Sequence, residues 1–177
     1  MRGFDFSKYN RIILIGSPGS GKSWLAKRIA DITGYKLYHL DKEFHLPNWQ
    51  RPHRDIWVEK QEKMISGKKW IIDGHYNNTI ELRYAAADLV IFLDINPFVC
   101  MWGAAKRQGK KRSDFPDYLT EPKVFSRLFL NFCKDIWTFP KWGRRTVKNL
   151  REQYPKKEFL HIRSRRQIKK LLKNNNK

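Results

Sequence analysis

Short apolar runs separated by longer amphipathic stretches recur along the whole chain. Five of these runs have the length and composition of strands, and they lie at 11–15, 36–41, 70–73, 88–94 and 158–162. The run "DLVIFLD" is apolar along most of its length, as expected of a strand that is covered on both faces. Strands that alternate with helices predict a parallel sheet joined by right-handed crossovers.

Helical periodicity and terminal signals predict the connecting helices. The stretch that begins at Gly21 carries apolar residues at helical spacing, and Gly34 ends it. Asn96 as N-cap with Pro97 at the first helical position predicts a helix to about Arg107. Segment 43–52, which contains Pro47 and Pro52, is expected to be a loop. Further helices are expected after Pro52, at 80–87, 123–139 and 141–153, and after Ser164.

The loop after the first strand, "GSPGSGKS", fits the pattern G-x-x-x-x-G-K-[ST]. It consists of Gly16, Ser17, Pro18, Gly19, Ser20, Gly21, Lys22 and Ser23. Its glycines allow several backbone N–H groups to point at one anion, and the helix that follows adds its positive end. The ammonium of Lys22 can reach the β- and γ-phosphates of a nucleotide, and the hydroxyl of Ser23 can bind Mg²⁺. Because the motif follows an apolar strand and opens a helix, the sequence predicts a nucleotide site.

Length and composition limit the number of domains, the possibility of a membrane span and the state of the cysteines. The 177 residues suffice for one domain, so we expect a single three-layer α/β P-loop domain over 1–177 with helices on both faces of a five-stranded parallel sheet. The apolar runs are too short to span a bilayer, which argues against a membrane partner. Cys100 and Cys133 lack metal-type spacing, and we expect two reduced, buried thiols in a cytoplasmic protein.

Three aspartates fall at the ends of expected strands, where ligands of parallel α/β sheets bind. A carboxylate there can hold Mg²⁺ or position a nucleophilic hydroxyl. Asp73 is the first candidate, because Gly74 follows it and allows close approach of a ligand. Asp41 is a candidate for the acceptor side of the site, and Asp94 is a further metal candidate. Each of the three could instead cap a turn.

The charge of the chain is strongly positive, with a formal net charge of +20. Such a field attracts nucleotides, nucleic acid or an acidic surface without choosing among them. Segment 106–112, "KRQGKKR", gathers five cations after the fourth strand. Arginines there could close over a transferring phosphoryl group, or the segment could be a solvated basic turn or a nucleic-acid patch.

Seven tryptophans are present, and their contexts differ. Trp49 lies in the expected loop beside Pro47, which suits stacking on a base. Trp70 begins a strand and is expected in the core, and Trp57, Trp102 and Trp137 lie in expected helices and are interpreted as packing residues.

Taken together, the loop 12–23, "WIIDG", "ADLVIFLD" and the arginine segment resemble those of adenylate-kinase-like P-loop kinases. More closely, the chain resembles the DNA topology modulation protein family. The resemblance covers about 11–113 and includes "HLD" at 39–41, "WIIDGHYNNT" at 70–79 and Arg83.

This resemblance implies roles for individual residues. Lys22 and Ser23 would hold ATP and Mg²⁺, and Asp73 matches the aspartate of the "DG" element in nucleoside monophosphate kinases. Arg107 and Arg112 match lid arginines that clamp phosphates.

The resemblance also implies two substrate-facing segments. The acceptor arm would be 43–69, and the short basic lid would be 106–118, with Asp114 and Asp117 as acidic partners of the arginines. The sequence departs from monophosphate kinases at "DGHYN", which lacks the arginine that grips the acceptor, and Arg83 is expected to replace it.

The predicted function is ATP- and Mg²⁺-dependent phosphoryl transfer to a small acceptor, a nucleotide or nucleoside. Lys22, Arg107 and Arg112 would stabilise developing charge, while Ser23 and Asp73 organise the metal. Asp41, Trp49 and Arg83 would contact the acceptor. The alternative is a nucleotide-gated nucleic-acid-binding protein that affects DNA topology with vestigial kinase chemistry. The polar tail at 173–177 is expected to be frayed.

Overall fold

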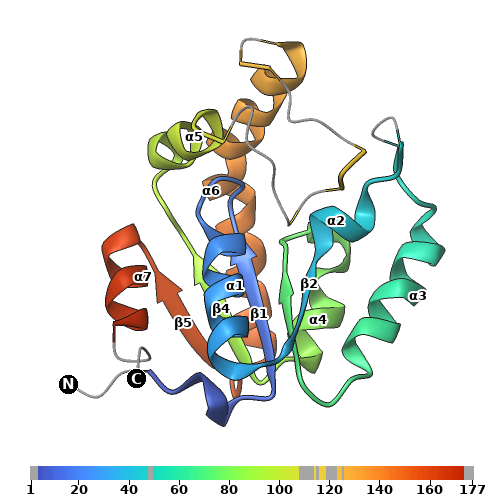
Figure 1. Cartoon of the computed structure of the whole chain (residues 1–177), viewed down its shortest axis with the longest axis vertical. Helices are drawn as coiled ribbons and strands as arrows, with labels where there is room; N and C mark the ends of the chain where they lie inside the picture. The colour runs from blue at the N-terminus through green and yellow to red at the C-terminus, as the bar shows by residue number, and fades with distance from the viewer. Residues whose placement is uncertain are drawn as a thin grey trace.

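The structure is a computed structural model that describes residues 4–47, 50–107, 114, 116–118, 123–124 and 126–173. Its strands are β1 (Arg11–Gly16), β2 (Lys36–His39), β3 (Trp70–Asp73), β4 (Leu89–Leu93) and β5 (Glu158–Ile162). They form one parallel sheet in the order β2-β3-β1-β4-β5 (Figure 1). The predicted five-stranded parallel sheet is confirmed.

Helices cover both faces of this sheet. On one face, Ile12 and Leu14 of β1 share a core with α1 (Lys22–Thr33), α5 (Pro97–Ala105) and α7 (Arg165–Leu172). On the other face, Ile13 and Ile15 pack with α3 (Arg54–Ile65), α4 (Ile80–Ala86) and most of the buried side of α6 (Arg127–Gln153). Figure 1 shows α1 and α7 in front of the sheet and α6 passing behind it. Because strand side chains alternate between faces, β1 contributes to both cores, and the three-layer prediction is confirmed.

The predicted helix ends are confirmed by their caps. The side chain of Asn96 accepts a hydrogen bond of 2.9 Å from the amide of Phe98. Ser164 and Gln167 form a reciprocal capping box at the start of α7. Gly34 ends α1 in the left-handed conformation, with φ at 70°.

One helix, α6, replaces the two helices predicted at 123–139 and 141–153. It begins at Arg127, where the Ser126 side chain accepts a hydrogen bond from the amide of Phe129, and it continues through Pro140. Proline removes one helical hydrogen bond and costs about 3 kcal/mol in a helix interior. Phe139 and Val147, on either side of Pro140, are both buried against the sheet, so apolar burial offsets this cost.

A short helix, α2 (Leu40–Phe44), occupies part of the segment predicted as strand and loop. The strand β2 ends at His39 instead of Asp41, because Leu40 turns inward and is fully buried. Asp41 therefore lies in the first turn of a helix. The short 3-10 segments η1 (Phe6–Lys8) and η3 (Asn77–Thr79) complete the described elements.

The tryptophan and cysteine predictions are partly confirmed. Trp57 and Trp70 are buried, as predicted. Trp102 and Trp137 are 55% and 53% exposed and therefore lie outside the core, where the Trp137 ring contacts that of Phe98 at 5.3 Å between centroids and Arg165 lies over the Trp102 ring. Both cysteines are free, but only Cys100 is buried, whereas Cys133 is partly exposed.

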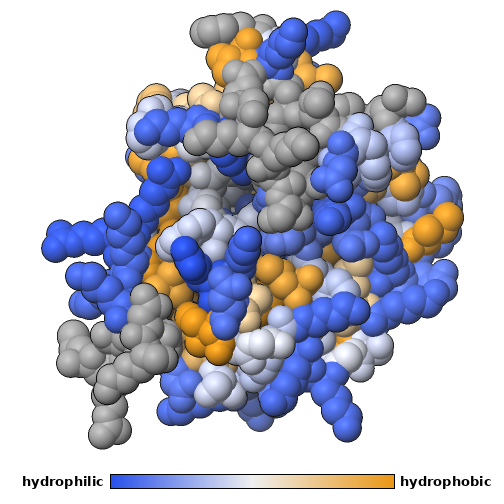
Figure 2. All heavy atoms as spheres, viewed as in Figure 1, coloured by the Kyte–Doolittle hydropathy of each residue, from blue (hydrophilic) through white to orange (hydrophobic). Residues whose placement is uncertain are grey.

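The surface agrees with the charged composition. Figure 2 shows hydrophilic residues over most of the face viewed, with smaller apolar areas between them. None of the helices in the described ranges is both long enough and apolar enough to cross a bilayer.

Candidate active site

The centre of the sheet is a switch point, because β1 lies between β3 and β4 and the chain turns in opposite directions on its two sides. Ligands of open α/β sheets bind at such a point, beyond the carboxyl ends of the strands. The glycine-rich loop leaves β1 there and enters α1 at Lys22.

The backbone of this loop depends on glycine. Gly16, Gly19 and Gly21 have φ values of 141°, 75° and 99°. A Cβ added to Gly19 would overlap the carbonyl oxygen of Cys100 in α5, and one added to Gly16 would overlap that of Leu93. The loop is therefore pressed against α5 and β4 in a conformation that other residues would strain.

Lys22 and the start of α1 complete an anion-binding arrangement. The Nζ atom of Lys22 donates a hydrogen bond of 3.0 Å to the carbonyl of Ser17, which holds the ammonium over the loop. Gly21 is the N-cap of α1 and has no side chain, so the first amides of the helix face the loop without a side-chain cap.

A cavity of about 520 Å³ opens on the loop. Four of the side chains that line it are cationic, namely Lys27, Arg107, Arg165 and Lys169. Ser23 also lines it, next to Trp24. Arg107, the predicted lid arginine, thus lies at the cavity, whereas Arg112 and Trp49 lie outside the described residues.

Arg165 connects two walls of this cavity. Its Nη2 atom donates a hydrogen bond of 3.2 Å to the carbonyl of Val99 in α5. Its guanidinium also lies over the Trp102 ring, 6.0 Å from the centroid. These contacts hold the first turn of α7 against α5 and present positive charge beside the loop.

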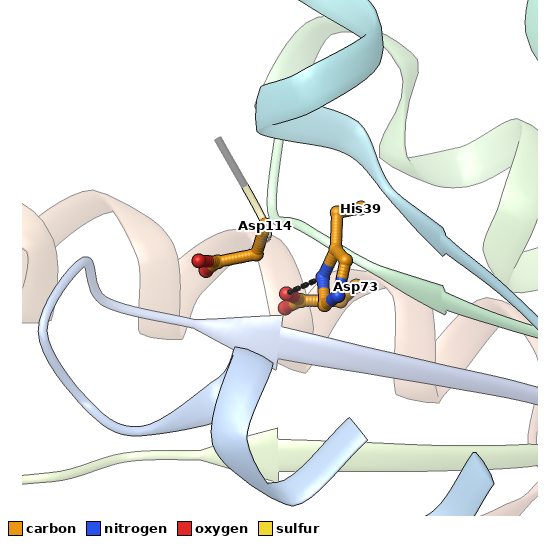
Figure 3. A group of neighbouring side chains, drawn as sticks. All are labelled: His39, Asp73 and Asp114. Atoms are coloured by element: carbon orange, nitrogen blue, oxygen red, sulfur yellow. Dashed lines mark hydrogen bonds and ion pairs between the residues drawn. The ribbon is translucent and has the colours of Figure 1, made fainter. Parts of the chain in front are cut away.

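A polar cluster forms at the ends of β2 and β3. His39 and Asp73 are register partners in the sheet, and Nδ1 of His39 lies 3.0 Å from Oδ2 of Asp73. Asp114 joins them from the segment between α5 and α6 (Figure 3), and the ligand atoms of the three residues lie within 4.8 Å of one another. Asp73 is only 5% exposed, and its Oδ1 atom is buried without a hydrogen-bond partner.

Asp41 is positioned by a tyrosine. The Tyr76 hydroxyl donates a hydrogen bond of 2.9 Å to Oδ1 of Asp41. The ring of Tyr76 contacts Phe44 and Trp57, with centroids 4.7 Å and 5.5 Å away. Burial, followed by the charge of Asp41, raises the pKa of Tyr76, so the phenol stays protonated and donates.

His75 lies between the phosphate loop and α6. Its ring is buried and makes edge contacts with Phe139 and Trp142. Burial lowers the pKa of His75 to about 3, and the positive charges of Lys22 and Arg83 act in the same direction. His75 is therefore neutral at physiological pH.

Arg83 has internal partners. Its side chain is fully buried, and it donates to the carbonyls of His75 at 2.7 Å and Thr79 at 3.1 Å, and to the side chain of Gln61. These contacts hold the loop after β3, and an acceptor would have to displace one of them to reach the guanidinium. The acceptor contact predicted for Arg83 therefore stays a prediction, and the observed contacts favour a supporting role.

The third strand-end aspartate, Asp94, has cationic and histidine partners. It pairs with Nε of Arg144 at 2.9 Å and lies 3.1 Å from Nε2 of His161. These interactions join β4 to α6 and β5. Asp73, at the end of β3, and Asp41, in the first turn of α2, thus remain the candidate carboxylates on the side of the predicted acceptor arm.

Sequence reasoning assigned no role to His39, His75, Tyr76 or Arg165. A signal was available for His39, because the end of a parallel strand places its last side chain beside that of the neighbouring strand. The positions of the other three depend on packing between distant segments, which strand and helix patterns do not report.

No protein-family model matches the sequence, and no curated protein matches it. The resemblance to the DNA topology modulation family therefore stays a prediction. Among solved structures, shikimate kinase from Acinetobacter baumannii in complex with shikimate matches with a TM-score of 0.61 at 13% identity. That alignment covers 94% of this chain and 93% of the kinase.

The chain shares its fold with shikimate kinase. Deoxyadenosine kinase from M. mycoides is a more distant match, with a TM-score of 0.45 at 14% identity for the form with bound dATP and 0.46 for the form with bound dCTP. These alignments cover 93% of this chain and 97% of the kinase. The fold is thus the P-loop NTPase-like α/β fold, with the parallel sheet and the glycine-rich loop in their expected places.

Proposed function

We propose that this protein catalyses ATP- and Mg²⁺-dependent phosphoryl transfer to a small acceptor, a nucleotide or nucleoside. Three observations support the proposal: Lys22 begins α1 directly after the glycine-rich loop, Asp73 ends β3, which pairs with β1, and Arg107 lines the cavity that opens on the loop. A loop that only holds a nucleotide needs amides and a lysine. Transfer also needs positive charge on the moving group and a carboxylate near the metal.

The donor nucleotide would bind at the loop and cavity. The amides of the loop and the ammonium of Lys22 would hold its phosphates, with Arg107 and Arg165 supplying further positive charge from the cavity wall. We place Arg112 in the same role, as a second lid arginine. Lys22 and Arg165 are held by hydrogen bonds to backbone carbonyls before any ligand binds, so little reorganisation of these two groups would accompany charge development.

The residues present fit Mg²⁺. Ser23 supplies a hydroxyl at the cavity, and Asp73 supplies a buried carboxylate oxygen with no hydrogen-bond partner. When bound, Mg²⁺ neutralises charge on the phosphates of the donor. Asp73 and Ser23 would orient it relative to the loop.

The acceptor would lie on the side of Asp41, with the acceptor arm at 43–69 around it. The Tyr76 hydrogen bond fixes one oxygen of Asp41, which leaves the carboxylate oriented to accept from an acceptor hydroxyl. Trp49 would stack on the acceptor base. Arg83 would support this side indirectly, through the backbone that it holds after β3.

The test is acceptor-dependent formation of ADP. Purified protein is incubated with ATP and Mg²⁺ and a panel of nucleosides, nucleoside monophosphates and 5′-hydroxyl oligonucleotides, and ADP and phosphorylated product are quantified together. We expect equal amounts of ADP and product with one acceptor class. Lys22→Ala should lower this turnover by about 10²-fold or more while the protein folds normally.

Matched controls sharpen this experiment. Lys27→Ala removes a cation from the same cavity without touching the loop motif, and it should lower turnover far less than Lys22→Ala does. ADP without any phosphorylated product across the panel would overturn the proposal. The net charge of +20 supports the alternative of a nucleic-acid-binding protein that affects DNA topology. Nucleic-acid binding that weakens steeply as salt is added, together with no phosphoryl transfer to any acceptor, would favour this alternative.

A further inference from the structure

We infer that His39, Asp73 and Asp114 bind one divalent transition-metal ion directly, before any nucleotide is present. This site deepens the proposed function, because it shares Asp73 with it. It does not depend on phosphoryl transfer, since all three ligands belong to the chain.

The sheet register brings the first two ligands together. His39 ends β2 and Asp73 ends β3, and the two are opposite each other in the parallel pair. Metal bonds of about 2.1 Å place neighbouring ligand atoms about 3.0 Å apart and opposite ones about 4.2 Å apart. The 3.0 Å between His39 Nδ1 and Asp73 Oδ2 matches the first spacing, and the ligand atoms of all three residues lie within 4.8 Å of one another.

The third ligand comes from a distant part of the chain. Asp114 lies between α5 and α6, and in Figure 3 its carboxylate extends alongside that of Asp73 at the end of the sheet. Two carboxylates this close to each other favour a cation between them, because like charges raise the free energy of the ionised pair. A divalent ion bound there would bring two positive charges to both carboxylates.

The buried oxygen of Asp73 is the independent sign of a missing partner. Asp73 is 5% exposed, and while Oδ2 contacts His39, Oδ1 is buried with no hydrogen-bond partner. An unpaired buried carboxylate oxygen costs free energy that native proteins seldom leave uncompensated. A cation held between Asp73 and Asp114 would supply the partner.

The ligand types select the metal class. Mg²⁺ is bound almost entirely by oxygen, whereas an imidazole nitrogen with two carboxylates suits Mn²⁺, Co²⁺ or Zn²⁺. His39 and Asp114 also line the cavity, so the remaining coordination positions of the ion would face it. Water or a phosphate oxygen could occupy those positions.

The first experiment titrates the protein with Mn²⁺ alone and follows free Mn²⁺ by electron paramagnetic resonance, without nucleotide. We expect one Mn²⁺ per chain, and a loss of affinity of about 10-fold or more in Asp114→Asn and His39→Asn. His39→Asn retains a polar group near Asp73 but replaces nitrogen ligation, so it should also lower the preference for Mn²⁺ over Mg²⁺. Asp31→Asn, at a 54% exposed carboxylate in α1, is the matched control and should bind Mn²⁺ as the wild type does.

A second measurement does not depend on variants that fold. In the wild type, electron spin echo modulation from a directly bound imidazole nitrogen should accompany the bound Mn²⁺. No Mn²⁺ binding without nucleotide, or bound Mn²⁺ without nitrogen modulation, would overturn the inference and leave His39 and Asp73 as a hydrogen-bonded pair. Failure of acceptor-dependent ADP formation with Mg²⁺ would instead overturn the proposed function and leave this metal site intact.

Discussion

The hydroxyl of Tyr76 donates a 2.9 Å hydrogen bond to Oδ1 of Asp41, and so joins the loop after β3 to the first turn of α2. Tyr76 has a φ of 38°, and among the described residues it is the one non-glycine with a positive φ. A left-handed conformation costs a non-glycine residue about 1–2 kcal/mol, so the surrounding contacts must offset it. Phe44 and Trp57 supply those contacts and hold the phenol at Asp41.

Replacing this phenol tests the role of Asp41 on the acceptor side. Tyr76→Phe removes the hydrogen bond and leaves one oxygen of Asp41 without its protein partner. We expect a loss of about 1 kcal/mol in the free energy of unfolding by urea, and an increase in KM for the acceptor with KM for ATP unchanged. Tyr35→Phe, which removes only a 3.4 Å exposed hydrogen bond, should change neither value. Equal effects on both KM values would contradict an acceptor-side position for Asp41.

A pair of glycine substitutions separates backbone strain from loop geometry. Gly19 and Gly34 have φ values of 75° and 70°, so alanine is strained at both by about 1 kcal/mol. Only at Gly19 would the new Cβ also overlap the Cys100 carbonyl, whereas nothing lies within 4 Å at Gly34. Gly19→Ala should therefore abolish ATP binding measured by calorimetry, and Gly34→Ala should retain it with a slightly lower Tm. ATP binding at wild-type affinity by Gly19→Ala would show that the loop tolerates displacement from α5.

The two candidate roles of Arg83 predict different outcomes. If Arg83 acts by holding the loop after β3, Arg83→Met leaves the carbonyls of His75 and Thr79 buried without a donor. We expect a loss of about 3 kcal/mol or more in the free energy of unfolding, with a smaller loss in Arg83→Lys. Arg28→Lys, at a 57% exposed arginine, serves as the control. Unchanged stability together with a raised acceptor KM would restore the direct acceptor contact predicted from the sequence.

The buried ring of His75 predicts a pH dependence of stability. Burial, assisted by Lys22 and Arg83, lowers its pKa from 6.5 in the unfolded chain to about 3 in the folded protein. Between these values the unfolded state binds the proton and the folded state does not, so stability rises with pH through this window and falls on acidification. From pH 7 to pH 5, His75 should lower the free energy of unfolding by about 2 kcal/mol.

Urea denaturation at the two pH values measures this effect. Between pH 7 and pH 5, the free energy of unfolding of His75→Gln should fall by about 2 kcal/mol less than that of the wild type, because glutamine does not bind a proton in this range. His53→Gln, which removes a 75% exposed histidine, controls for a general change in charge. Identical acid sensitivity in wild type and His75→Gln would show that the ring is accessible to protons in the folded protein.

Local patterns in the sequence predict most of the secondary structure. The five strands, the glycine-rich loop and the caps at Asn96 and Ser164 depend on residues within a few positions of each other, and the structure has them where expected. The exceptions have tertiary causes. The helix α6 continues through Pro140 because burial on both sides of the proline offsets its cost, and β2 ends early because Leu40 turns into the core.

Some residues of the candidate site can also be predicted from local sequence patterns, whereas others are brought there only by the tertiary fold. Lys22, Ser23 and Asp73 are recognisable in the sequence, because a phosphate loop and a strand-end carboxylate are local patterns. The partners of these residues depend on which strands become neighbours and which helices cross them. Register between β2 and β3 brings His39 to Asp73, and the packing of η3 and α4 buries Arg83 and turns Tyr76 toward Asp41. The His39–Asp73 and Tyr76–Asp41 contacts join residues that are 34 and 35 positions apart in the sequence. The free energy of such contacts depends on how deeply the assembled fold buries them. A local stretch of sequence therefore does not predict them.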